Sequence, residues 1–183
     1  MIYILLGTGF EEAEALVTAD VLRRAELPVS LAGIGGDQIT GSHGITVRAD
    51  VKAEDVALSE GDTLVLPGGM GGVTSMEGSE AAMALMREAA ENYRLAAICA
   101  APTLLARAGL LKQGAHCVCY PGMEGELSAA GAVPQMDRST VVDGNLVTGR
   151  GPGAAFDFGL KLVEVLAGAD AARTVAAGLV YGA

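Results

Sequence analysis

Cys99 is the residue whose surroundings most clearly predict chemistry. It lies in the segment LAAICAAPTLLA, residues 95–106, where a short apolar run meets a helical run with no loop between them. Residues 95–98 predict a buried strand, and Pro102 suits the first turn of a helix, where its missing N–H costs nothing. We therefore expect the thiol at a tight strand-to-helix elbow, beside the positive end of a helix dipole, which favours the reactive thiolate.

A buried structural cysteine is the competing interpretation of Cys99. Free cysteines are among the most buried residue types and usually pack as small hydrophobes. The local pattern leaves both interpretations open, so the choice depends on residues elsewhere in the chain.

Glu14 is a carboxylate in an apolar position on a helix predicted over residues 11–25. It falls on the apolar stripe of that helix, which consists of Phe10, Val17, Val21 and Ala25. A buried carboxylate must be paired or protonated. It either finds a backbone N–H or solvent at the sheet edge, or it lies beside Cys99 with a raised pKa as a proton carrier. Glu11 and Glu12 are explained by the helix dipole alone.

Two glycine-containing turns are candidate anion-facing loops. Gly68 and Gly69 follow an apolar run, and glycine lets backbone N–H groups come close to an oxyanion. Arg150 lies in the segment GRGPG, residues 149–153, directly before a predicted helix. An ordinary tight turn also explains each segment, and neither has the spacing of a nucleotide-binding loop.

The sequence shows no motif for a metal or a cofactor, so we expect neither. His43 and His116 are the only histidines and lie far apart in the chain. Cys117 and Cys119 flank one residue of a predicted strand and are expected to point to one face of it. Structural packing is favoured for them over the role of a resolving thiol for Cys99.

Composition predicts an acidic globular protein. The 183 residues contain no linker-like stretch, which indicates one domain over residues 1–183. Twelve Lys and Arg against 22 Asp and Glu give a formal charge of −10, which argues against nucleic acid and anionic membranes as partners. No apolar run reaches the ~18 residues of a membrane span. The first residues lack the positive region of a signal peptide, so we expect a cytoplasmic protein.

Apolar runs alternate with helical patterns along the chain. Strands are predicted at 2–6, 29–34, 63–66, 95–98 and 116–120, hairpins at 38–49 (turning at 42–44) and 140–148, and helices at 11–25, 80–91, 154–166 and 171–178 and after Cys99. This alternation predicts an α/β fold with a mostly parallel sheet covered on both faces. Functional groups gather at the carboxyl ends of such strands, so residues 7–12, residues 67–69 and Cys99 are expected to share one crevice.

Taken together, these motifs resemble those of the DJ-1/PfpI superfamily (also called ThiJ/PfpI), in the branch of the Parkinson-disease-associated DJ protein and its bacterial relatives. They are GFEEAE at 9–14, ADVLRRA at 19–25, LPGG at 66–69, AAICAAPT at 96–103 and GRGPG at 149–153, followed by FDF. The resemblance implies a flavodoxin-like three-layer sandwich and a homodimer. It also implies that Cys99 is the reactive, oxidisable cysteine and Glu14 its hydrogen-bonded acid, with Gly69 and Ala100 as backbone donors.

The resemblance further implies a pocket near Cys99, lined by Gly68, Tyr120, Pro121 and Arg150. Tyr120 stands before Pro121 where many relatives carry a histidine, so a Cys–His pair is not available there. The protease-like branch carries a histidine directly after its nucleophile, where this chain has an alanine, so a peptidase triad is not expected. His43 stands near the place of an arginine that faces the pocket in human-type proteins.

Two functions fit these residues. The first is a cofactor-independent, cysteine-dependent enzyme of the glyoxalase or deglycase type, acting on 2-oxoaldehydes such as methylglyoxal or on glycated substrates. Its turnover is expected to be weak, because proton transfer rests on Glu14 alone. The second is a redox-sensing, stress-protective, chaperone-like protein in which Cys99 is oxidised to a sulfinate. An amidotransferase or peptidase would need a base beside Cys99 that the sequence does not offer.

Overall fold

The structure, a computed structural model, describes residues 1–182 and is built around one seven-stranded sheet, in the order β10-β11-β7-β6-β1-β2-β5. Neighbouring strands are parallel, except that the edge strand β10 runs antiparallel to β11. The strands are β1 (Ile2–Leu6), β2 (Val29–Gly33), β5 (Val51–Lys52), β6 (Thr63–Leu66), β7 (Arg94–Ile98), β10 (Thr140–Asp143) and β11 (Leu146–Gly149). The central strands are almost continuously apolar because both faces of the sheet are covered.

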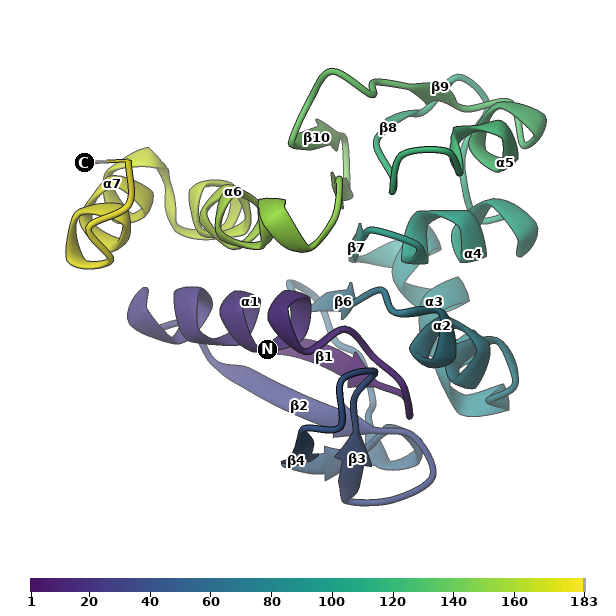
Figure 1. Ribbon diagram of the computed structural model, residues 1–183, viewed down its shortest axis with the longest axis horizontal. Coiled ribbons are helices and arrows are strands. Elements are labelled where there is room, and N and C mark those ends of the chain that lie inside the picture. Colours follow the sequence, from purple (N-terminus) through teal and green to yellow (C-terminus); the bar gives the residue numbers. More distant parts are fainter. Residues whose placement is uncertain (183) are drawn as a thin grey trace.

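Helices cover both faces of this sheet. They are α1 (Glu12–Arg24), α2 (Met70–Glu77), α3 (Glu80–Asn92), α4 (Ala101–Arg107), α5 (Glu124–Ala129), α6 (Ala155–Ala167) and α7 (Ala169–Gly178), with short 3-10 turns η1 (Ala53–Asp55) and η2 (Pro152–Ala154). Figure 1 shows α1, α6 and α7 on one side of the sheet and α2, α3 and α4 on the other. The expected α/β fold with a mostly parallel sheet is confirmed. None of the helices within residues 1–182 is long and apolar enough to cross a membrane.

Two small sheets lie outside the central one. The predicted hairpin is present as β3 (Gln38–Thr40) and β4 (Thr46–Arg48), which pair in antiparallel fashion. The strand predicted over residues 116–120 is wrong beyond its second residue. Only β8 (His116–Cys117) is a strand, paired with β9 (Val133–Pro134). After it, the Val118 N–H donates to the Thr148 side-chain hydroxyl at 3.0 Å instead of to a neighbouring strand.

The helix α2 was not expected, because it carries Gly71 and Gly72, which have low helix propensity. Packing requires these small residues. A Cβ at residue 72 would lie 2.7 Å from the Phe10 Cα, and one at residue 71 would lie 3.0 Å from the Gly9 Cα. The loop after β1 therefore sits directly on α2, and tertiary contact outweighs local preference. The short helix α5 was likewise not expected.

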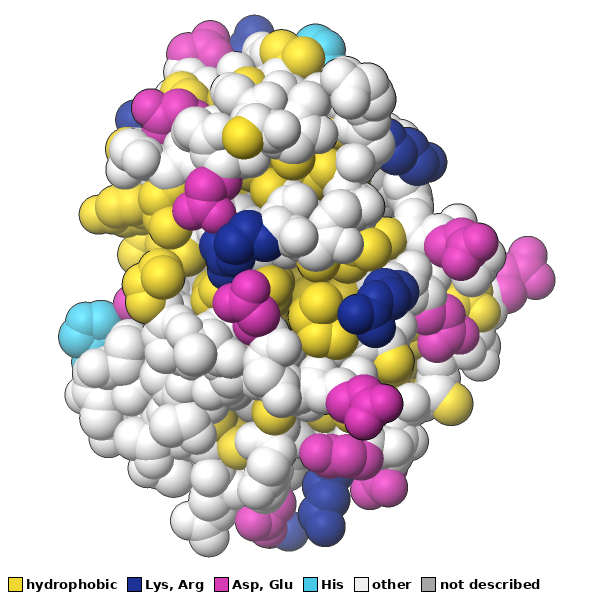
Figure 2. All heavy atoms as spheres, turned by 90° about the vertical axis from the view of Figure 1, so that its right-hand side faces the viewer, with side chains coloured by type: hydrophobic (Ala, Val, Ile, Leu, Met, Phe, Trp, Pro, Cys, Tyr) yellow, Lys and Arg dark blue, Asp and Glu magenta, His cyan; other side chains and the backbone are white. Residues whose placement is uncertain are grey.

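The helix α4, which begins just after Cys99, is held by a network of side chains. Figure 2 shows the side of the molecule that lies on the right in Figure 1, where acidic, basic and apolar side chains are interspersed. Arg107 forms ion pairs with Glu77 of α2 at 3.1 Å and with Glu126 of α5 at 2.8 Å. It also donates to the Thr103 hydroxyl, which in turn donates to the Ala100 carbonyl at 2.8 Å. The first turn of α4 is thereby fixed relative to two neighbouring helices.

The strands that lead to the candidate residues are neighbours. In the sheet, β7 lies between β11 and β6, and β6 lies between β7 and β1. The register pairs Gly149 with Ile98, and Leu66 with Ala97. Parallel strands in this register end at the same edge of the sheet, so the segments that follow them meet there.

Candidate functional site

Cys99 is the first of the two residues between the end of β7 and the start of α4. Its φ of 65° is in the left-handed region, which is strained for a residue with a side chain. Two hydrogen bonds hold this backbone: the Cys99 N–H donates to the Gly149 carbonyl at 3.0 Å, and the Cys99 carbonyl accepts from the Tyr120 N–H at 2.8 Å. The side chain is almost buried, at 8% exposure. Strain held in place by neighbouring segments is typical of functional positions rather than of ordinary packing residues.

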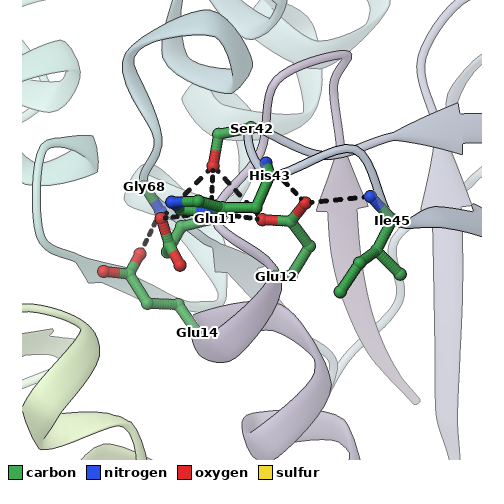
Figure 3. A network of polar contacts seen from close by, with 7 residues as sticks. All are labelled: Glu11, Glu12, Glu14, Ser42, His43, Ile45 and Gly68. Carbon is green, nitrogen blue, oxygen red and sulfur yellow. Dashed lines mark hydrogen bonds and ion pairs between the residues drawn. The ribbon is translucent and has the colours of Figure 1, made fainter.

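Glu14 reaches this elbow from the first turn of α1 and is 1% exposed. Its Oε2 accepts the Gly68 N–H at 2.6 Å (Figure 3). Its Oε1 is buried and has no partner of ordinary hydrogen-bond geometry within the described residues. The carboxyl also lies against the Cys99 thiol, close enough that each group shifts the pKa of the other. Both alternatives open for Glu14 therefore apply: it meets a backbone N–H, and it lies beside the thiol.

Gly68 lies between the Glu14 carboxyl and the Cys99 thiol, where there is room for the backbone but not for a side chain. A Cβ at this residue would lie 2.7 Å from the Cys99 Cβ and 2.8 Å from the Glu14 Oε2. Gly69 has a φ of 81°, and a Cβ there would lie 2.4 Å from the Gly9 carbonyl oxygen. Only glycine fits at either position, because the loop after β1 and the elbow both approach this backbone closely.

The electrostatics of Glu14 follow from its burial. Desolvation raises the pKa of this carboxyl to about 7, and the nearby charge of Glu11 raises it as well. The contact with the Cys99 thiol and the Gly68 N–H act in the opposite direction. A carboxyl that titrates near neutral pH is suited to take up and release protons during a reaction.

The pKa of the Cys99 thiol is shifted in the opposite direction to the one expected from the sequence. Burial raises the pKa of the thiol, and the charge of Glu14 raises it further, although the backbone N–H groups of Ala100 and Gly69 lower it. The expectation that the elbow favours a resting thiolate is wrong, chiefly because the thiol is buried. The helix that follows has only seven residues, and desolvation of the thiol, assisted by the charge of Glu14, outweighs the effect of its dipole. Cys99 is instead held as a thiol next to the Glu14 carboxyl.

Tyr120, Pro121 and Arg150 come together in a pocket of about 540 Å³ next to the elbow. The Tyr120 backbone joins this pocket to Cys99 through the hydrogen bond described above. Within residues 1–182, Cys99, Glu14 and Gly68 are not among the residues that line it. The residues expected to line one pocket therefore lie in two places. Gly68 lies beside the thiol, whereas Arg150 is exposed and lines the neighbouring pocket.

Cys117 and Cys119 are fully buried free thiols, as is expected of packing residues. Burial raises the pKa of Cys117 to about 11 and that of Cys119 to about 12, with nearby carboxylates adding to the effect. Neither thiol has the accessibility or the thiolate character of a reactive cysteine.

Glu12 is a residue whose role the sequence did not reveal (Figure 3). Its side chain is buried, and it anchors the β3–β4 hairpin: Oε1 accepts the N–H groups of His43 at 2.7 Å and Ile45 at 3.3 Å, and Oε2 meets the His43 Nδ1 at 3.0 Å. Burial alone would raise its pKa, but these hydrogen bonds lower it to about 2. The helix dipole is thus an incomplete explanation of Glu12. A tertiary contact between a helix start and a hairpin turn leaves no local signal, apart from Gly41, whose missing Cβ makes room for the Glu12 carboxyl.

The comparisons with known proteins agree on one family. The sequence profile of the DJ-1/PfpI family matches residues 1–165. Protein dj-1beta of Drosophila melanogaster is 42% identical over 179 residues, which cover 96% of this chain and 94% of that protein. The glutathione-independent glyoxalase DJR-1.2 of Caenorhabditis elegans is 31% identical over 160 residues, or 87% of this chain and 84% of that protein.

A solved structure shows the same likeness in three dimensions. The crystal structure of Drosophila melanogaster DJ-1beta superposes with a TM-score of 0.92 at 38% identity, covering 100% of this chain and 98% of that one.

Proposed function

The chain belongs to the DJ-1/PfpI family, and from this premise we propose that it is a cofactor-independent, cysteine-dependent enzyme that converts 2-oxoaldehydes such as methylglyoxal to 2-hydroxy acids. The observation that carries the proposal is the meeting of a strained thiol, a buried acid with a pKa near 7, and backbone donors at one sheet edge. A relative named as a glutathione-independent glyoxalase supports the choice of substrate class.

In the first step, the Cys99 sulfur adds to the aldehyde carbon, and the carbonyl π electrons move to the oxygen. Glu14 accepts the thiol proton as the sulfur–carbon bond forms, because its carboxylate lies against the thiol. The N–H groups of Gly69 and Ala100, which face the sulfur, are placed to stabilise the new oxyanion. Glu14 then returns the proton to that oxygen, which gives a hemithioacetal.

In the second step, the Glu14 carboxylate removes the hydrogen of the former aldehyde carbon as a proton and delivers it to the adjacent ketone carbon. The hydroxyl proton on the carbon bearing sulfur moves to the former ketone oxygen, so that this hydroxyl becomes the thioester carbonyl and the ketone becomes a hydroxyl. The carbon bearing sulfur is oxidised and its neighbour is reduced, so no external oxidant or cofactor takes part. The product is a thioester on Cys99. Water cleaves this thioester, releasing the 2-hydroxy acid (lactate from methylglyoxal) and the free thiol.

Proton transfer in this scheme depends on a single acid–base group. Tyr120 stands near the elbow where many relatives have a histidine, and its side chain is 48% exposed in the adjoining pocket. A phenol hydroxyl can donate or accept a hydrogen bond but does not replace an imidazole as an acid–base group. We therefore propose that turnover is slow. Glycated adducts of the same aldehydes are proposed as a second substrate class.

The proposal is tested by lactate formation from methylglyoxal in buffer without amines or added thiol. Wild type, Cys99→Ala and the matched control Cys117→Ala are compared, because both substitutions remove one buried sulfur. Turnover that is lost only in Cys99→Ala supports the enzyme. Equal, background-level conversion in all three proteins would overturn it.

A redox sensor is the second candidate, and the accessibility of the thiols favours it. Cys99 is 8% exposed, whereas the other two cysteines are at 0%. Two equivalents of hydrogen peroxide would oxidise Cys99 to a sulfinate and be reduced to water, and a protonated Glu14 Oε1 could then donate a hydrogen bond to it. Peroxide-induced sulfinate at Cys99, detected by mass spectrometry, without thiol-dependent lactate formation would favour this function over the enzyme.

We further propose that the protein is a homodimer in the cytoplasm. Family resemblance supports the dimer, and light scattering on the purified chain tests it. Three free cysteines within residues 1–182 suit a reducing compartment. Fractionation of the source cells tests the location.

A further inference from the structure

Four side chains converge where α1 begins and the β3–β4 hairpin turns: Glu11, Glu12, Ser42 and His43 (Figure 3). One carboxylate oxygen of each glutamate and one ring nitrogen of His43 lie within 4.8 Å of one another. We propose that this cluster is a binding site for a divalent transition-metal ion, with Zn²⁺ as the best fit. The inference stands apart from the proposed enzyme, because neither Ser42 nor His43 contributes to the thiol site.

The spacing of the donor atoms carries the proposal. The His43 Nδ1 lies 3.0 Å from the Glu12 Oε2 and 3.7 Å from the Glu11 Oε2. The Ser42 Oγ lies 3.3 Å from the Glu11 Oε2, 3.2 Å from the Glu12 Oε2 and 3.0 Å from the His43 Nδ1. Zinc bonds of about 2.0–2.2 Å to nitrogen and oxygen give a tetrahedron with edges of about 3.4 Å. Five of the six edges between these four atoms are thus already near that length.

The charge balance of the cluster also calls for a cation. The side chains of Glu11 and Glu12 are only 16% and 6% exposed, and within residues 1–182 neither carboxylate forms an ion pair with a lysine or arginine. A buried and a half-buried carboxylate next to each other repel, and a cation between them relieves that repulsion. Within the described chain, His43 is the only ion-pair partner of either carboxylate.

The donor set selects the class of metal. An imidazole nitrogen combined with carboxylate oxygens suits zinc and its transition-metal neighbours, whereas magnesium and calcium prefer oxygen ligands alone. The second oxygen of Glu12 accepts the N–H groups of His43 and Ile45, which fixes the orientation of the ligating oxygen. The His43 side chain is 69% exposed, so the ion has an open path from solvent.

The test is calorimetric titration of the intact protein with ZnCl₂, with MgCl₂ as the comparison. Wild type is expected to bind one equivalent of zinc and no magnesium at the same concentration. His43→Asn and Glu11→Gln each remove a ligand and should weaken zinc binding at least about tenfold. His116→Asn removes the only other histidine and should bind zinc like wild type. Cys99→Ala should also bind like wild type, because the thiol is not a ligand.

Thermal unfolding without zinc identifies any variant that fails to fold. Glu11→Gln is the decisive variant, because it leaves all backbone hydrogen bonds of Glu12 in place. Zinc should raise the unfolding temperature of wild type and His116→Asn but not that of Glu11→Gln. Zinc binding that is absent from wild type, unchanged in Glu11→Gln, or lost in Cys99→Ala would overturn the proposal.

Discussion

Glu12 and Glu14 lie two residues apart on the same helix, and both are buried, yet their acidities differ widely. The pKa of Glu12 is lowered to about 2, and that of Glu14 is raised to about 7. Desolvation raises the pKa at both positions, so burial alone does not account for the difference. Glu12 accepts hydrogen bonds from two backbone N–H groups and meets two side chains, whereas Glu14 has one backbone donor and a thiol.

The difference shows how one helix start supports two kinds of site. Where the hairpin turn supplies many donors, the carboxylate is held ionised and anchors the hairpin. Where glycines bring only one N–H, the neighbouring carboxyl keeps an exchangeable proton. The number of donors around a buried carboxyl therefore separates structural from chemical roles here.

The largest expected effect comes from exchanging each carboxyl for its amide. Glu14→Gln keeps the shape but cannot carry a proton, so turnover should fall by roughly 10²–10⁴-fold. Glu12→Gln loses charged hydrogen bonds to the hairpin, which should cost about 1–3 kcal/mol of stability. It should change turnover by no more than a few-fold. Kinetics and thermal unfolding of both variants check this contrast. Retained turnover in Glu14→Gln would remove Glu14 from the mechanism.

A methyl group placed between the acid and the thiol should give the next largest effect. Gly68→Ala puts a Cβ within 2.8 Å of both Cys99 and Glu14, so one of them must move. We expect about 1–3 kcal/mol of destabilisation from overpacking, together with a fall in kcat in the folded protein. Gly125→Ala is the matched control, because its Cβ would meet no atom within 4 Å. Equal kinetics for both variants would contradict the geometry of the site.

The pH dependence of stability should differ in sign between the two carboxyls. Glu14 has a folded pKa of about 7 against an ordinary 4.5, so its contribution is full below pH 4.5 and is lost as pH rises through about 7. Glu12 has a folded pKa of about 2, so its contribution is full above pH 4.5 and is lost as pH falls towards 2. Urea unfolding across this range should show Glu14→Gln flattening the loss towards neutral pH and Glu12→Gln flattening the loss in acid. The same slope change in both variants would refute the distinction.

The smallest expected effect lies in the outer pocket. Arg150 is exposed and does not touch the thiol or the acid, so it can contribute only to binding. Arg150→Gln should raise KM for methylglyoxal by a few-fold, or about 1 kcal/mol or less, and leave kcat unchanged. Steady-state kinetics checks the split between the two constants. A fall in kcat with KM constant would place Arg150 in the chemistry instead.

Much of the thiol site could be predicted from sequence because its parts carry local signals. The apolar run before Cys99, the proline just after it and the misplaced Glu14 are each visible within a few residues. The convergence follows from a general property of parallel sheets, whose strand ends share one edge. Family resemblance then identified the backbone donors Gly69 and Ala100.

The remainder depends on contacts between distant segments. In the sequence, Glu12 is an ordinary acidic residue in the first turn of a helix, and its contact with the hairpin exists only in the folded protein. The two histidines are far apart in the chain, so the sequence did not predict that His43 lies close to two carboxylates. The helix α2 forms despite the low helix propensity of its glycines, because residues 9–10 pack onto it. The expectation of a resting thiolate at Cys99 was wrong because a local pattern does not show how strongly the thiol is desolvated, and burial is the main cause of its raised pKa.

The most direct test of the central claim is a ¹³C NMR titration of the glutamate side-chain carboxyls, with Glu14→Gln and Glu12→Gln used for assignment. We expect one carboxyl, that of Glu14, to titrate near pH 7, and that of Glu12 to remain ionised down to about pH 2. The Glu14 pKa should rise further in Cys99→Ala, because the thiol contact lowers it. A Glu14 carboxyl that titrates near 4.5 and does not respond to loss of the thiol would contradict the account.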